Sequence, residues 1–177
     1  GAARAEVEIG FYSKDLASTF PHAFVRLTGT DELTGQAFDT NYGFTPVRIT
    51  PGVLFGPVEG MIQTVDPVYV SRSDRHFSLK LSPEQYRAVL AVVERWRTAG
   101  QPSYRLNSRN CVHFVAEVAA ALGFHAPPAK GLMNKPKSFL QKVTSDNMAL
   151  IAQWTERTWP RAAAIAPESA PAPAPAQ

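Results

Sequence analysis

Cys111 and His22 are the residues of this chain whose types and surroundings suit nucleophilic catalysis. A cysteine thiolate attacks carbonyl carbon atoms, and it needs a neighbouring base, for which histidine is the common choice. Cys111 is the chain's one cysteine, so it cannot form an intramolecular disulfide. The alternative role for Cys111 is that of a small buried apolar residue, and the residue type alone does not decide between the two roles.

The elements around Cys111 favour the reactive role. A helix is predicted to begin after Asn107 or Ser108, to run to Leu122 and to stop at Gly123. Cys111 then falls in the first turn, where unpaired N–H groups and the positive end of the helix dipole stabilise a thiolate. Its helical phase places it on the apolar face, so the thiol is expected to point toward the sheet and not toward bulk water.

Among the four histidines, His22 is the one selected as the base. His113 is two residues from Cys111, a rotation of about 200° on a helix, which predicts that it faces the other way. His76 is expected on the wet face of a strand and His125 in a loop. His22 lies in an apolar strand, where an imidazole is costly to bury without a partner. A core histidine satisfied by a backbone carbonyl is the alternative for His22.

The first 80 residues indicate strands separated by Gly, Asp and Pro, and the period then changes to that of helices. Ser82, Pro83 and Gln85 form a capping-box pattern that predicts a helix ending at Gly100. A further helical segment is expected from Pro136 to Trp159. The predicted strands are Val7 to Ser13, Pro21 to Thr28, Ala37 to Phe44, Met61 to Val70, and His76 to Leu81.

This layout predicts an α+β fold with a mainly antiparallel sheet packed against helices. A chain of 177 residues with 45% apolar residues suits a single domain, expected over residues 1–160. Residues 161–177 alternate Pro with Ala and Ser and are expected to form a tail. The segment from Pro46 to Gly60 is expected to be a surface loop or, as a weaker prediction, a lid over the site.

The charge of the chain is mild and gives no sign of a nucleic-acid partner. The formal net charge is +3, from 18 basic and 15 acidic residues. No run of apolar residues approaches the length of a membrane span, so no integral membrane segment is expected. The chain starts with Gly1 in place of Met, which suggests a processed precursor, and a periplasmic or secreted location is the expectation.

The run Asn110-Cys111-Val112-His113-Phe114 resembles the Asn-Cys-Glu-His-Phe signature of the lecithin:retinol acyltransferase group. That group belongs to the circularly permuted branch of the NlpC-type papain-like superfamily. The order of parts is also similar, with a His first on a strand, a polar residue on the next strand, and the nucleophilic Cys last on a helix. The resemblance implies a permuted papain-like fold with His22 and Cys111 as the catalytic pair. Val112 departs from the signature, where a Glu is usual.

The same resemblance implies a third catalytic residue on the strand after His22, within residues 38–44. Asn41 is the first choice because an amide can orient an imidazole, and Asp39, on the same strand face, is the alternative.

The expected function is amide hydrolysis through a Cys-His acyl-enzyme, with a peptide or peptidoglycan-like substrate and with no cofactor or metal. The alternative is a lipid acyltransferase or phospholipase, with a lipid partner. A third interpretation, from a different class, is a binding module that keeps the fold without catalysis. The sequence does not predict the oligomeric state.

Overall fold

A five-stranded sheet and a set of helices make up the part of the chain that the computed structural model describes, residues 6–15, 21–31, 33–98 and 104–158. The strands are β1 (Val7–Lys14), β2 (His22–Thr30), β3 (Ala37–Pro46), β4 (Gly60–Gln63) and β5 (Asp74–Leu81). The helices are α1 (Pro67–Ser71), α2 (Pro83–Thr98), α3 (Cys111–Ala121), α4 (Pro136–Asp146) and α5 (Met148–Thr158), with a 3₁₀ turn η1 (Pro51–Leu54).

The sheet has the strand order β4-β3-β2-β1-β5, and every neighbouring pair is antiparallel. The α+β class and the antiparallel sheet expected from the sequence are therefore confirmed. β2 is the central strand of the sheet, and β1 is its neighbour. His22 is the first residue of β2, where it pairs with Lys14 at the end of β1.

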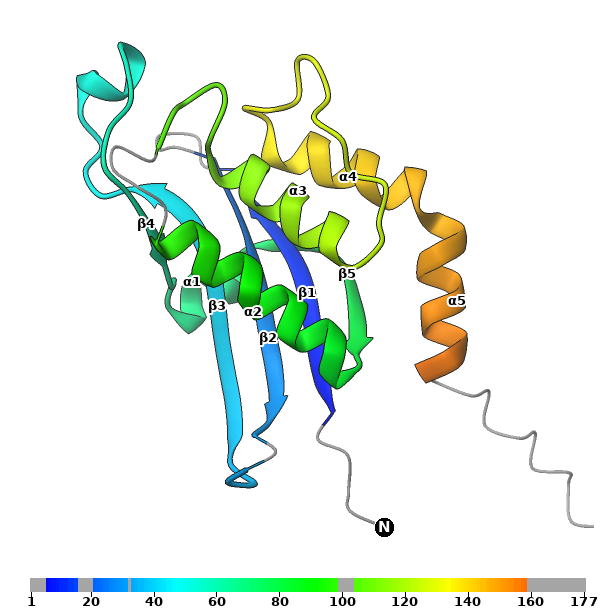
Figure 1. Cartoon of the computed structure of the whole chain (residues 1–177). Coiled ribbons are helices and arrows are strands. Elements are labelled where there is room, and N and C mark those ends of the chain that lie inside the picture. Colours follow the sequence, from blue (N-terminus) through cyan, green and yellow to red (C-terminus); the bar gives the residue numbers. More distant parts are fainter. Residues whose placement is uncertain (1–5, 16–20, 32, 99–103, 159–177) are drawn as a thin grey trace, which may run out of the picture.

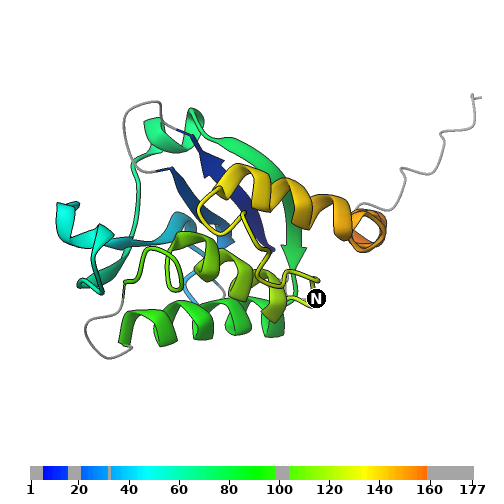
Figure 2. The ribbon, with the colours of Figure 1, turned by 90° about the horizontal axis from the view of Figure 1, so that it is seen from above.

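Helices α2, α3 and α4 cover one face of the sheet, whereas the short α1 lies on the other (Figure 1; Figure 2). Successive side chains of a strand point to opposite faces, and β2 shows this directly. Ala23 and Val25 enter the main core under the helices, and Phe24 joins a smaller cluster with Tyr12 and Val70 of α1. The sheet thus separates two apolar clusters of unequal size.

Helix α2 begins as the sequence predicts. The backbone N–H of Ser82 donates to Oε1 of Gln85 at 2.8 Å, and the N–H of Gln85 donates to the hydroxyl of Ser82 at 3.2 Å. This reciprocal pair is the capping box. The expected stop at Gly100 lies outside the described residues.

Two predicted elements differ from the structure. The strand expected from Met61 to Val70 ends at Gln63, because Asp66 caps a new helix and Pro67 occupies its first turn. The helical segment expected from residue 136 is two helices separated at Asn147. Asn147 is buried and follows the last residue of α4. Its side-chain amide accepts from the backbone N–H of His125 and donates to the carbonyl of His125, both at 2.8 Å.

The predicted tail, residues 161–177, lies outside the described residues. Within the described part, none of the helices is long and apolar enough to cross a membrane.

Candidate functional site

Cys111 is the first residue of α3, and Asn110 is its N-cap. The side-chain oxygen of Asn110 accepts from the N–H groups of Val112 at 2.8 Å and His113 at 3.3 Å. The helix therefore starts later than the predicted caps at residues 107 and 108. Those residues belong instead to a tight turn, in which the N–H of Arg109 donates to the carbonyl of Arg105 at 2.9 Å.

His113 takes part in this cap. Its Nδ1 accepts from the backbone N–H of Asn110 at 3.2 Å and lies 2.9 Å from the side-chain oxygen of the same residue. The imidazole is thus engaged with the start of its own helix, on a different side from the thiol, as its helical phase predicts.

The thiol of Cys111 is buried at the end of β2, with Sγ 4.0 Å from the carbonyl oxygen of Pro21. Burial raises the pKa of Cys111 to about 11, and backbone N–H groups of Ala23, Val112 and Cys111 itself act in the opposite direction. The thiol is accordingly neutral at pH 7 in this arrangement, although N–H groups that favour a thiolate already surround it.

His22 is the first residue of β2, and its ring lies on the face of the sheet that carries Phe24. The two rings stack with centroids 5.8 Å apart, and the edge of Tyr69 meets the imidazole at 6.4 Å. Burial lowers the pKa of His22 to about 4, so the ring is neutral at pH 7. Nε2 is buried without a hydrogen-bond partner among the described residues.

Gly43 of β3 is the residue against which Nε2 lies. A β-carbon at position 43 would be 2.4 Å from Nε2 and 2.7 Å from Cε1 of His22. Real contacts of that length do not occur, so glycine is what leaves room for the imidazole. A glycine inside a strand often marks such a close approach, and this was the signal in the sequence that could have identified Gly43.

Asn41 and Asp39, expected as alternatives for the residue that orients the base, make other bonds. The amide of Asn41 donates to the carbonyl of Val65 at 2.9 Å and accepts from its N–H at 2.7 Å. Asp39 receives two hydrogen bonds from Arg26, at 2.9 and 2.7 Å. Neither side chain is hydrogen-bonded to His22. The register of β2 on β3 is the reason, because it brings Gly43 to the imidazole.

Cys111 and His22 line one cavity of about 420 Å³ at this end of the sheet. They reach it from different sides, since Cys111 belongs to the main core and His22 stacks on the Phe24 face. No hydrogen bond joins the two side chains in this arrangement. The other lining residues are Pro21, Phe44, Thr45, Pro46, Ile49, Gln63, Val65, Asp66, Tyr69 and Tyr104.

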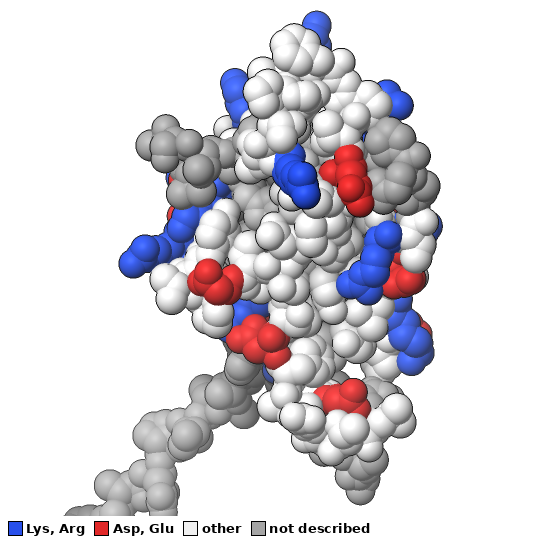
Figure 3. Space-filling model, turned by 90° about the vertical axis from the view of Figure 1, so that its left-hand side faces the viewer, with Lys and Arg blue, Asp and Glu red and all other residues white. Residues whose placement is uncertain are grey.

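The segment between β3 and β4 contributes Ile49 to one wall of this cavity, next to Pro46 at the end of β3. The two ends of this segment are joined by a hydrogen bond from the backbone N–H of Val47 to the carbonyl of Glu59. Between them the segment projects beyond the sheet, drawn in cyan in Figure 1. Its tip is apolar and exposed, with Phe55 85% accessible to solvent. In Figure 3 this end of the molecule is mainly white, the colour of residues other than Lys, Arg, Asp and Glu.

The described residues contain no group of three or more His, Cys, Asp and Glu side chains that could hold a metal ion. The lining of the cavity includes the thiol of Cys111 and the imidazole of His22. Both of these residues were selected from the sequence, and the structure places them on one cavity. Tyr69, which packs on the imidazole, was not selected, because residues 64–70 were assigned to a strand.

No family model matches the chain, and neither a curated protein nor a solved structure matches it.

Proposed function

We propose that this protein is a cysteine-dependent amide hydrolase in which Cys111 is the nucleophile and His22 the general base. The observation that carries the proposal is the cavity of about 420 Å³ that Cys111 and His22 both line, with the thiol at the first residue of a helix. A structural cysteine or histidine needs no cavity. A nucleophile and a base that line the same open cavity are what acyl transfer requires.

The reaction begins when His22 removes the thiol proton of Cys111 and the sulfur attacks the carbonyl carbon of the substrate. The tetrahedral oxyanion that forms is stabilised by backbone N–H groups near the sulfur, of which that of Ala23 is one. The protonated imidazole then gives its proton to the leaving amine, and the C–N bond breaks. Water, deprotonated by His22, hydrolyses the acyl-cysteine and restores the thiol.

Both groups are neutral at pH 7, because the pKa of His22 is about 4 and that of Cys111 is about 11. These resting values oppose proton transfer from the thiol to the imidazole, so the mechanism requires substrate binding to bring the two groups together and to move both pKa values toward 7. The two groups lack a hydrogen bond at rest, so the His22 ring has to turn from Gly43 toward the sulfur when substrate binds. Catalytic hydrogen bonds are often long in free enzymes and tighten in the substrate complex.

The proposed machinery is a dyad. Because Gly43 occupies the position on β3 that faces Nε2, no side chain of that strand orients the imidazole. Packing replaces that function, with Phe24 on one side of the ring and the edge of Tyr69 on another.

Peptide amides, including those of peptidoglycan, are the proposed substrates. Gln63, Asp66 and Thr45 line the cavity and offer groups that bond a peptide backbone, and the expected periplasmic or secreted location would fit wall peptides. One observation favours the lipid alternative. Ile49 and Phe55 expose apolar surface beside the cavity, 60% and 85% accessible, which suits an acyl chain or a lipid surface.

The test is to incubate the protein with peptidoglycan fragments and, separately, with phospholipid vesicles, and to identify the products by mass spectrometry. The comparison uses wild type, Cys111→Ala, His22→Gln and, as a matched control, His125→Gln, whose ring lies outside this cavity. We expect amide cleavage by wild type and His125→Gln only. Ester cleavage in place of amide cleavage establishes the lipid alternative. If Cys111→Ala cleaves as wild type does, Cys111 is not the nucleophile and the proposal fails. If no substrate is cleaved, the proposal also fails, and that outcome favours the binding module.

A further inference from the structure

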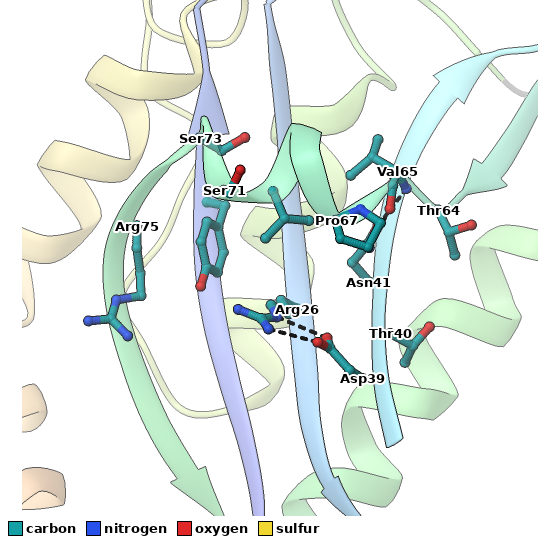
Figure 4. A pocket seen from close by; sticks show the side chains of 12 residues that line it. Arg26, Asp39, Thr40, Asn41, Thr64, Val65, Pro67, Ser71, Ser73 and Arg75 are labelled. Atoms are coloured by element: carbon teal, nitrogen blue, oxygen red, sulfur yellow. Dashed lines mark hydrogen bonds and ion pairs between the residues drawn. The ribbon is translucent and has the colours of Figure 1, made fainter. Parts of the chain in front are cut away.

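A second cavity, of about 590 Å³, lies on the face of the sheet that α2, α3 and α4 leave uncovered. Four strands and the segment that contains α1 surround it. Figure 4 shows Arg26 of β2 paired with Asp39 inside the cavity, and Arg75 of β5 at its edge, with the guanidinium turned away from Arg26. This cavity contains neither Cys111 nor His22. Its lining residues are Tyr12, Arg26, Asp39, Thr40, Asn41, Thr64, Val65, Pro67, Val70, Ser71, Ser73 and Arg75.

The lining has an excess positive charge. Arg26 is held by both carboxylate oxygens of Asp39 and by the hydroxyl of Tyr12, and these bonds raise its pKa above the usual range of arginine. The same ion pair lowers the pKa of Asp39, so both groups are charged at neutral pH. Arg75 has no ion pair or hydrogen bond from its side chain to any described residue. Within the described part of the chain, the Arg75 guanidinium therefore makes no ion pair that would compete with a bound anion.

The aromatic ring of Tyr12 forms an apolar wall beside these charges. It lies close over Gly10, where a β-carbon would be 2.6 Å from Cε2 of Tyr12, and it stacks on Phe24 at 5.2 Å. Val70 and Pro67 extend the apolar surface, and the neutral polar groups of the lining belong to Thr40, Asn41, Thr64, Ser71 and Ser73. Such a lining combines an unpaired cation with a flat apolar surface.

We propose that this cavity binds an organic anion, whose carboxylate or phosphate oxygens contact the open edge of Arg26 and Arg75, the exposed side chain of Arg75 turning toward the cavity, while its apolar part packs on Tyr12. A guanidinium presents several N–H groups in one plane and is well suited to carboxylate and phosphate oxygens. The site stands independently of the chemistry at Cys111. It adjoins that cavity all the same, because Val65 lines both, and Asn41 holds Val65 in place (Figure 4).

The probes are benzoate and phenyl phosphate, with benzamide as the uncharged analogue of benzoate. The full chain, labelled with ¹⁵N, is titrated at constant ionic strength, and amide chemical shifts are followed. We expect saturating shifts centred on Tyr12, Arg26 and Arg75 for both anions and none for benzamide. Shifts centred elsewhere, or equal effects of benzoate and benzamide, overturn the proposal. A response to only one of the two anions identifies which oxyanion the site takes and still supports it.

Variants make the test specific. Arg75→Gln should weaken anion binding by up to about five-fold, as expected for the loss of one solvent-accessible ion pair, and Arg75→Lys should weaken it less. Asp39→Asn should strengthen binding, because it removes the carboxylate that competes for Arg26. Arg97→Gln, on α2 and paired with Glu94, is the matched control and should bind as wild type does. Unchanged binding in Arg75→Gln, or weaker binding in Asp39→Asn, contradicts the site.

Cys111→Ala should bind both anions with wild-type affinity. That variant separates the two proposals, because Cys111 does not line this cavity. Loss of catalysis together with unchanged anion binding would support both the hydrolase and the anion site. Catalysis without anion binding refutes this site and leaves the hydrolase intact.

Discussion

The imidazole of His22 occupies the space directly beside the α-carbon of Gly43, where a β-carbon would lie 2.4 Å from Nε2. A side chain at position 43 would therefore collide mainly with the imidazole of His22. The same β-carbon would also lie 3.3 Å from the carbonyl oxygen of Ala23. Gly43→Ala should therefore displace the ring and destabilise the fold by about 1–3 kcal/mol, as overpacking does.

A double-mutant cycle of Gly43→Ala with His22→Ala checks this relationship by thermal or urea unfolding. Because His22→Ala removes the ring that the new methyl group meets, the double variant should be more stable than the sum of the single effects predicts, by about 0.5–3 kcal/mol. Additive effects would show that the ring does not rest on Gly43.

Acid should destabilise the protein through His22. Its pKa is about 4 when folded, against 6.5 when the ring is free, so the unfolded state binds the proton more tightly. Stability is fully retained above pH 6.5 and falls as the pH drops toward 4, by about 3 kcal/mol. Urea unfolding from pH 7 to pH 4 should show a shallower loss for His22→Gln than for wild type. Some slope remains, since burial also lowers the pKa of His76 and His113. Identical slopes would contradict the assigned shift.

Alkylation of Cys111 should be slow in the free protein. With a pKa of about 11 the thiolate is rare at pH 8, and the thiolate is the form that reacts. Iodoacetamide labelling, followed by intact mass from pH 7 to pH 11, should lag behind that of the urea-unfolded protein and rise with pH. The sequence alone predicted an activated thiol in the first turn of a helix. Labelling of the folded protein that is faster than that of the unfolded protein would support that earlier expectation and contradict the resting state described above.

Asn41 should act on stability and not on the thiol-imidazole pair. The amide of Asn41 forms hydrogen bonds with both backbone groups of Val65. Asn41→Ala therefore leaves a partly buried N–H and C=O without partners, and each costs up to about 3 kcal/mol of folding stability. The unfolding temperature of Asn41→Ala measures the loss of stability. The pKa of His22 in the same variant, followed by NMR, should stay near 4. A large change in that pKa with little loss of stability would return Asn41 to the role expected from the sequence, that of orienting the base.

The sequence predicted the elements whose signals are local. The strands β1, β2 and β5, the capping box of Ser82 and Gln85, and the cysteine in the first turn of a helix all depend on neighbours within a few residues. These features were confirmed with boundaries close to those expected.

The relationships that decide the site are not local. The register between β2 and β3 places Gly43, and not Asn41, beside His22, and register depends on a loop whose geometry the sequence did not fix. The amides of Asn41 and Asn147 each bond the backbone of a residue more than 20 positions away. No sequence periodicity signals such bonds. Asn41 was therefore expected from the sequence to orient the imidazole, whereas its amide bonds the backbone of Val65.

The most direct test of the central claim is to trap the acyl-enzyme. Wild-type protein is mixed with p-nitrophenyl acetate, quenched in acid and digested, and the acetylated residue is located by mass spectrometry while nitrophenol release is followed in time. The account predicts an acetyl group on Cys111, none in Cys111→Ala, and acylation slower by about 10²-fold or more in His22→Gln, the typical contribution of a general base. His125→Gln should match wild type. Acetylation confined to lysine side chains, or equal rates in wild type and His22→Gln, would contradict it.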